Sequence, residues 1–154
     1  MYDITKITKS INLMNVTSLV NYSKKVNEIA TITRLSAPEY IRDFIMAYDM
    51  TATMLSSLTR DFLEAKAALD HAESIAYLEE AAEYLKKNEI KDTADARKRY
   101  VDVNPVVVEC KDLVGRITAM DQLLKNKLIL FKAAHDDVKK IYYADQERSA
   151  FEGM

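Results

Sequence analysis

We predict an all-α protein in which long amphipathic helices pack into an elongated helical bundle, and two observations favour this fold class. The 154 residues include only two glycines and two prolines, with no Asn-Gly or Asp-Gly pair, whereas β-rich folds need many tight turns made from such residues. Apolar residues, which make up 49% of the chain, recur at helical spacings of three and four. The length fits a single helical domain over residues 1–154.

The N-terminal segment, residues 1–34, is rich in Thr, Ser, Asn, Ile and Val, which are indifferent helix formers. Ile4, Ile7, Ile11 and Met14 nevertheless follow a 3–4–3 spacing, which is helical and heptad-like. The abundance of β-branched residues also allows a strand pair. Both interpretations stay open at this level, and we favour the helix.

Residues 36–87 are predicted to form a long helix or a helical hairpin. Ser36 can cap the helix, Pro38 fits its first turn, and Glu39 lies at the capping-box position. No glycine or proline interrupts the pattern after Pro38, so one continuous helix is favoured, and a fold-back near Leu69–Glu73 is the alternative. The apolar stripe consists of Ile41, Phe44, Ile45, Tyr48, Ala52, Leu55, Leu58, Phe62, Leu69, Ala72, Ile75 and Ala76.

A loop over Asn88–Asp92 and a short helix over residues 94–102 are predicted next. Either Asp92 or Thr93 can cap this short helix. The pair Asn104-Pro105 then combines a capping residue with a proline at the first helical position, which predicts the start of another helix.

The C-terminal helix, residues 105–148, gives the strongest periodic signal in the chain. Its stripe consists of Cys110, Leu113, Ile117, Met120, Leu124, Leu128, Phe131, Ala134, Val138 and Ile141. Gly115 within it costs about 1 kcal/mol relative to alanine and suggests a close helix approach. Long amphipathic helices in a small chain leave apolar surface uncovered, so we expect a homo-oligomer with coiled-coil-like packing.

The chain offers no recognisable enzymatic motif. Two glycines exclude a phosphate-cradling loop, and no nucleophile elbow is present. Cys110 could pair with His71 or His135, but its place on the apolar stripe favours a core residue. Neither histidine has a glutamate three residues before it, as metal sites in helical bundles require. We therefore predict no enzyme, no metal and no cofactor, and rank a bundle enzyme or metalloprotein last.

Charge is distributed unevenly along the chain. The net charge of −2 weighs against a dedicated nucleic-acid binder. Residues 26–85, however, carry four Arg/Lys and eleven Asp/Glu, whereas residues 86–140 carry thirteen Arg/Lys and nine Asp/Glu. An acidic half followed by a mildly basic half is compatible with one functional basic face.

The candidate nucleic-acid-binding residues lie in the basic half, beside an aromatic ring. They are Arg97, Lys98, Arg99 and Tyr100, with Lys86 and Lys87 second. Cationic side chains neutralise phosphates and tyrosine rings stack on unpaired bases, so this combination favours single-stranded nucleic acid. Consecutive residues on a helix point about 100° apart, so at most two of the three consecutive cations can face one ligand.

Four stretches of the chain resemble a known family. They are "NYSKKVNE" (Asn21–Glu28), "YVDVNPVV", "MDQLLKNKLILF" and the tail "RSAFEGM". This layout resembles the phage recombination-mediator family, the UvsY-like single-stranded-DNA-binding accessory proteins. The resemblance implies a non-enzymatic helical oligomer that binds single-stranded DNA, contacts a single-strand-binding protein and helps to load a RecA-like recombinase. At the family's DNA-contacting position this chain carries Glu79, Glu80 and Glu83, and Lys86 and Lys87 would substitute.

The expected location is cytoplasmic, in the host cell if the protein is phage-encoded. A single cysteine excludes an intrachain disulfide framework. No apolar run approaches the roughly 20 residues that span a membrane, and no secretory signal is expected. The alternative function is a helical oligomeric phage protein that acts only through protein–protein contacts, as a structural, assembly or host-takeover factor.

Overall fold

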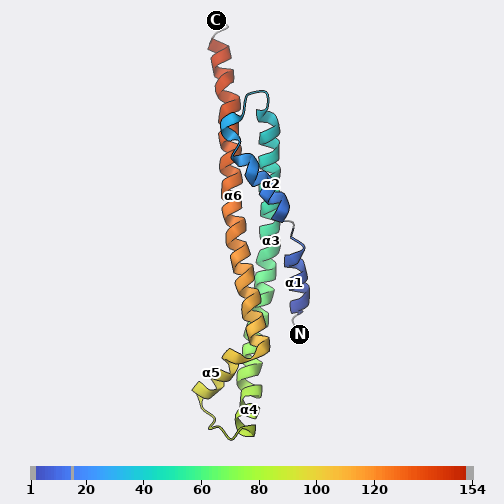
Figure 1. Cartoon of the computed structure of the whole chain (residues 1–154), viewed down its shortest axis with the longest axis vertical. Helices are drawn as coiled ribbons and strands as arrows, with labels where there is room; N and C mark the ends of the chain where they lie inside the picture. The colour runs from blue at the N-terminus through green and yellow to red at the C-terminus, as the bar shows by residue number, and fades with distance from the viewer. Residues whose placement is uncertain (1–2, 15, 152–154) are drawn as a thin grey trace. The chain divides into compact units, whose positions relative to one another are not determined.

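A computed structural model describes residues 3–14 and 16–151, with side chains through residue 144. All regular structure among these residues is helical and long helices pack into a bundle, so the predicted fold class is confirmed (Figure 1). Contacts divide the chain into two compact units. The first comprises Met1–Leu13 and Leu58–Met120, and the second comprises Met14–Ser57 and Asp121–Met154. The prediction of a single domain stays a prediction.

The elements follow the chain in a simple order. They are α1 (Ile4–Asn12), α2 (Val16–Val26), the 3-10 turn η1 (Ile29–Thr31), α3 (Ala37–Ile75), the π-helical turn η2 (Ala76–Glu80), α4 (Ala81–Lys87), α5 (Ala94–Val103) and α6 (Pro105–Phe151). No helix in the described part of the chain is long and apolar enough to cross a membrane.

In the first unit, α1 docks on α3 through both apolar and polar contacts. Ile7 and Ile11 are buried, as their predicted helical spacing requires. The hydroxyl of Ser10 donates a hydrogen bond of 2.7 Å to the carboxylate of Asp61, which is 3% exposed. A buried carboxylate needs such a partner, because an unpaired one is costly to remove from water. The Asp3 side chain caps α1 by accepting from the backbone N–H of Lys6.

The long middle segment is one continuous helical run rather than a hairpin. Helix α3 passes through Leu69–Glu73 without a turn, so the fold-back alternative was wrong and the single helix is confirmed. The run contains a π-helical turn at Ala76–Glu80, where the N–H of Ala81 donates to the carbonyl of Ala76. The sequence pattern did not predict this turn.

The joint between α5 and α6 is built as the Asn104-Pro105 pair predicts. The side-chain oxygen of Asn104 accepts from the backbone N–H groups of Val106, at 3.0 Å, and Val107, at 3.3 Å. Its amide nitrogen donates to Glu80 at 2.6 Å. Since Asn104 is only 6% exposed, these bonds replace water that cannot reach it. A small core of Ala76, Val101 and Val107 lies beneath the joint.

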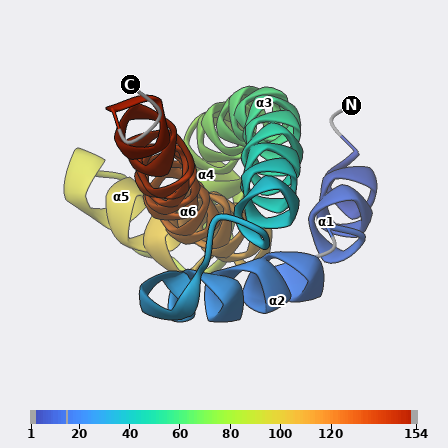
Figure 2. The same ribbon diagram turned by 90° about the horizontal axis from the view of Figure 1, so that it is seen from above.

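In the second unit, α2 lies against the first part of α3 and the last part of α6 (Figure 2). The ammonium of Lys25 pairs with the Asp43 carboxylate on α3, which raises the pKa of Lys25. The hydroxyl of Ser23 accepts from the ammonium of Lys127 on α6, at 2.8 Å. The regular structure among the described residues of the N-terminal segment is therefore helical, as favoured, and the alternative strand pair was wrong. The segment is divided between α1 and α2, with the two helices in different units.

Two local predictions were wrong. The hydroxyl of Ser36 does not form the expected capping box but exchanges hydrogen bonds with Thr33, and the N–H of Glu39 donates to the Ser36 carbonyl instead. Gly115 is exposed, and a Cβ added there would meet no atom within 4 Å, so it does not mark a close helix approach. The α6 stripe is confirmed, because its members are buried or half-buried throughout.

Candidate functional site: the α4–α5 hairpin

All six predicted site residues lie on the hairpin formed by α4, the loop 88–93 and α5 in the first unit. The chain leaves α4 through Asn88, whose N–H and side-chain amide both donate to the carbonyl of Tyr84. Glu89 follows with a φ of 54°, a left-handed conformation that reverses the chain direction. The hydroxyl of Thr93 then accepts from the N–H of Ala96 and caps α5.

Arg97 is held by groups within the hairpin. Its guanidinium donates two hydrogen bonds, at 2.7 and 2.6 Å, to the carboxylate of Asp92, and a third, at 3.1 Å, to the backbone carbonyl of Tyr77 in the π turn. The bonds to Arg97 lower the pKa of Asp92, and those to Asp92 raise the pKa of Arg97. The two bonds to Asp92 link the loop to α5, and the bond to Tyr77 links α5 to the π turn. The guanidinium could bind a phosphate only if some of these bonds were broken.

Tyr100 also contacts other residues of the first unit through its ring and its hydroxyl. Its ring packs against that of Tyr84, with centroids 5.1 Å apart and a tilt of 39°. Its hydroxyl donates a long hydrogen bond of 3.4 Å to Glu80. Burial, followed by the negative charge of Glu80, raises the pKa of Tyr100. The ring is half-buried, so only part of it is available to a ligand.

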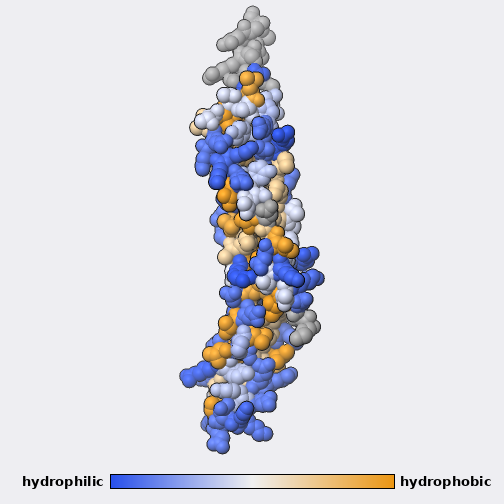
Figure 3. Space-filling view, turned by 45° about the vertical axis from the view of Figure 1, so that its right-hand side comes forward, coloured by the Kyte–Doolittle hydropathy of each residue, from blue (hydrophilic) through white to orange (hydrophobic). Residues whose placement is uncertain are grey.

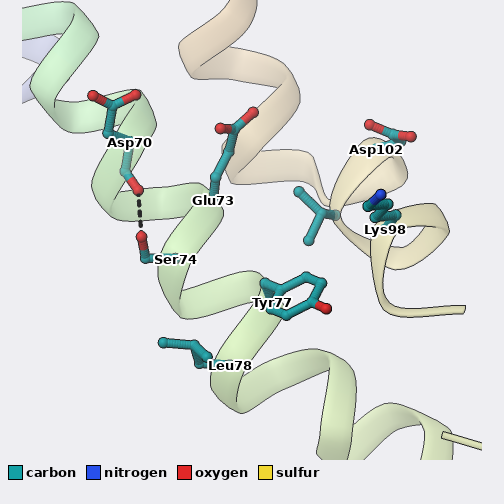
Figure 4. Close-up of a pocket in the computed structure, with 8 residues that line it drawn as sticks. Asp70, Glu73, Ser74, Tyr77, Leu78, Lys98 and Asp102 are labelled. Carbon is teal, nitrogen blue, oxygen red and sulfur yellow. Dashed lines mark hydrogen bonds between the residues drawn. The ribbon is translucent and has the colours of Figure 1, made fainter. Parts of the chain in front are cut away.

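Lys98 lies in a cleft lined mainly by acidic and apolar side chains (Figure 4). This cleft, of about 650 Å³, brings Lys98 and Asp102 of α5 opposite Asp70 and Glu73 of α3. Tyr77, Leu78 and Val101 also line the cleft. The ammonium of Lys111 pairs with Glu73 at 3.3 Å and with Asp102 at 3.5 Å, so the three carboxylates face two ammonium groups. The net charge of this group is −1, which disfavours a phosphate at Lys98.

Arg99 lies on the opposite side of the hairpin, on the rim of a groove between α4 and α5. The groove has a volume of about 660 Å³. Its rim carries Lys91, Asp95 and Arg99. Its apolar lining is formed by Tyr84, Leu85, Ile90, Ala96, Tyr100 and Val103. The sequence pattern did not predict this groove.

The structure therefore separates the predicted site residues. Lys98 and Arg99 lie in different clefts, and Arg97 is paired with Asp92. Lys86 and Lys87 are exposed in the last turn of α4, where cations favour the helix dipole. Residues 76–104 carry six Lys/Arg and seven Asp/Glu, so the hairpin as a whole is not basic.

The possible nucleophile Cys110 is buried, as predicted for a core residue, and burial raises the pKa of its thiol. It lines a cavity of about 200 Å³ with His71, Asn104 and Glu80. A raised thiol pKa keeps Cys110 protonated and disfavours nucleophilic attack. Among the described residues, no group of three His, Cys, Asp or Glu side chains is placed to hold a metal ion.

Comparison with known proteins finds no matching family model, no matching curated protein and no matching solved structure. The resemblance to the phage recombination mediators therefore stays a prediction from the residues that carry it. Evidence on function therefore comes from the geometry of the α4–α5 hairpin and from the side chains that are exposed on the surface of the protein.

Proposed function

We propose that this is a non-enzymatic helical protein that acts through protein–protein contacts, including self-association. The supporting observation is apolar exposure at the start of α6. Val106 is 53% exposed and Val108 48%. Burying a valine side chain contributes about 1.5–3 kcal/mol, so two exposed valines in the first turn of α6 favour a covering partner.

Other large apolar side chains also reach the surface. Those exposed by more than about three-fifths of their area are Leu13, Leu35, Leu63, Leu78, Val103 and Ile129. Hydrophobic side chains lie among hydrophilic ones on the face shown in Figure 3. A helical protein with apolar residues at such positions is suited to lateral helix–helix contacts.

Sedimentation velocity over a range of protein concentrations tests this proposal. We expect a species larger than the 17.6 kDa chain, in proportions that rise with concentration. Val108→Asp should reduce self-association while circular dichroism reports unchanged helix content. Thr118→Asp, at another exposed position of α6, is the matched control. A strict monomer that also fails to bind any protein would contradict the proposal.

A second candidate is the mediator function, in which the protein binds single-stranded DNA and helps to load a recombinase. The observation that favours it is that Lys86, Lys87 and Arg99 are exposed and form no ion pair with any residue in the described ranges. A RecA-like recombinase and a single-strand-binding protein would then be partners, as the family resemblance implies. The near-neutral charge of the hairpin weighs against it, so we rank it second.

Fluorescence anisotropy with labelled oligothymidylate at low salt tests the second candidate. The affinity for the oligonucleotide should fall steeply as the salt concentration rises, because lysine and arginine side chains that bind phosphates release counterions from the strand. Lys86→Glu combined with Lys87→Glu should weaken binding, whereas Lys132→Glu, an exposed lysine on α6, is the control. Absence of binding at low salt would reject the mediator function.

A further inference from the structure

The α4–α5 groove has the size and composition of a binding site. Its volume of about 660 Å³ lies within the roughly 300–1,000 Å³ usual for ligand pockets. Three of its lining side chains are unusually exposed for apolar residues, namely Tyr84 at 46%, Ile90 at 45% and Val103 at 72%. All three side chains line this one groove.

The groove is also held in shape before any ligand arrives. Ile90 is anchored by the hydrogen bond from its N–H to the carbonyl of Leu85, at 2.9 Å. The Tyr100 ring is held between the Tyr84 ring and the carboxylate of Glu80. The Arg97–Asp92 pair ties the loop to α5. Such preorganisation reduces the entropy that binding would otherwise cost.

The charged residues that line the groove, Lys91, Asp95 and Arg99, indicate which kind of ligand it can bind. Lys91 and Arg99 are exposed and form no ion pair with any described residue, so both can accept an anionic partner. Asp95 shares the rim, and Glu83 and Glu89 are exposed on the same hairpin. A nucleic acid, which carries a phosphate at each nucleotide, would place repeated negative charge against these carboxylates. A ligand with one or two carboxylates brings less negative charge to the groove and can pair with Lys91 and Arg99.

We propose that the α4–α5 groove binds a short peptide segment of another protein, in which a large apolar side chain is flanked by aspartate or glutamate. The apolar side chain enters between Ile90 and Tyr84, and the acidic residues meet Lys91 and Arg99. This site rests on the proposed function, because it is one of the protein–protein contacts through which we propose that the chain acts. It is separate from the self-association surface at Val108.

Selection from a displayed library of random dodecapeptides tests the site. We expect enriched peptides to contain a large apolar residue next to Asp or Glu, and to bind the full-length protein in fluorescence anisotropy. Arg99→Glu should weaken the best peptide by about tenfold or more, because one favourable charge pair becomes a repulsive one. Ile90→Asp should weaken it at least as much, since it places a charge in the apolar part of the groove.

The matched control is Lys98→Glu, which reverses the charge of the adjacent residue in the acidic cleft and should leave the peptide affinity unchanged. Circular dichroism of each variant establishes that the helices are intact. The proposed site would be overturned if the enriched peptides bound Arg99→Glu and Ile90→Asp as tightly as the wild type. It would also be overturned if the enriched peptides shared basic residues in place of Asp or Glu. So would oligothymidylate binding that Arg99→Glu abolishes, since a nucleic acid would then occupy the groove.

Sedimentation velocity on the same variants separates the two proposals. If the wild type self-associates and no peptide is enriched, the groove proposal fails and the proposed function stands. If Arg99→Glu and Ile90→Asp dissociate the oligomer, a second copy of the chain fills the groove and the peptide proposal is overturned. If the wild type neither self-associates nor enriches any peptide, both proposals fail.

Discussion

Replacing Asn104 by alanine should destabilise the protein more than any exposed polar substitution, because this side chain makes three hydrogen bonds at a nearly buried position. Loss of the cap on α6 costs about 1 kcal/mol. The N–H of Val107, a fully buried residue, then lacks its side-chain acceptor, and such a loss costs about 1–3 kcal/mol. Because the cap consists of these same bonds, the two costs overlap, and we expect Asn104→Ala to lower the free energy of unfolding by about 1–3 kcal/mol.

Asn104→Asp separates the cap from the contact with Glu80. The carboxylate can still cap α6, but it places a second negative charge where the amide now donates to Glu80 at 2.6 Å. Two adjacent carboxylates raise the folded-state pKa of one of them, so the folded protein binds a proton more readily than the unfolded chain. Relative to wild type, this variant should be destabilised at neutral pH and should recover as pH falls through that raised pKa.

Urea denaturation followed by circular dichroism measures both effects. Asn126→Ala, which removes the same amide from an exposed position on α6, should change stability by no more than about 0.5 kcal/mol. If Asn104→Ala falls within that same range, the account of the α5–α6 joint is wrong. An Asn104→Asp variant with no pH-dependent recovery would show that Glu80 does not contact this position.

Three further predictions concern other parts of the chain. Phe131→Ala should lower the free energy of unfolding by about 3–5 kcal/mol in urea denaturation, because this fully buried ring also contacts Tyr22 edge-on. Cys110 should react with a thiol reagent much more slowly in the native state than in denaturant, since it is buried and its thiol pKa is raised; equal rates would contradict its burial. Asp92 has a lowered pKa in the folded state, so the stability it contributes is present above its unfolded pKa of about 3.9 and is lost as pH falls through the folded value. Asp92→Asn should therefore flatten the acid limb of a stability–pH profile, and an unchanged limb would count against the pair with Arg97.

The helices were predictable because burial follows a period that residue types reveal. Leu124, Phe131 and Val138 recur every seven residues and are all fully buried. The start of α3 was less predictable, since Ser36 had two competing partners. Whether its hydroxyl bonds to the following turn or to Thr33 depends on the backbone before the helix, which periodicity does not describe.

The sequence could predict which segment carries the candidate site, but not how the individual side chains of that segment are arranged. The run Arg97–Tyr100 correctly indicated the hairpin, but not that one of its cations is paired, one lies among carboxylates and one faces an apolar groove. The groove needs Tyr84 beside Tyr100, and these tyrosines lie on different helices. Asp92, which directly precedes the capping residue Thr93, was the available signal that Arg97 would be paired.

The π turn at Ala76–Glu80 bears on how this chain can change in length. A π turn closes hydrogen bonds five residues apart, where an α-helix closes them four apart, so it holds one more residue than the α-helical path requires. Elsewhere in a helix, deleting a residue rotates everything beyond it by about 100°. A deletion within the π turn can be absorbed by its conversion to α-helix, which leaves the faces of α3 and α4 in their present relation. Related chains that differ by a single residue are therefore expected to carry the gap here, and an alignment that places it elsewhere in α3 or α4 would put buried and exposed positions out of phase.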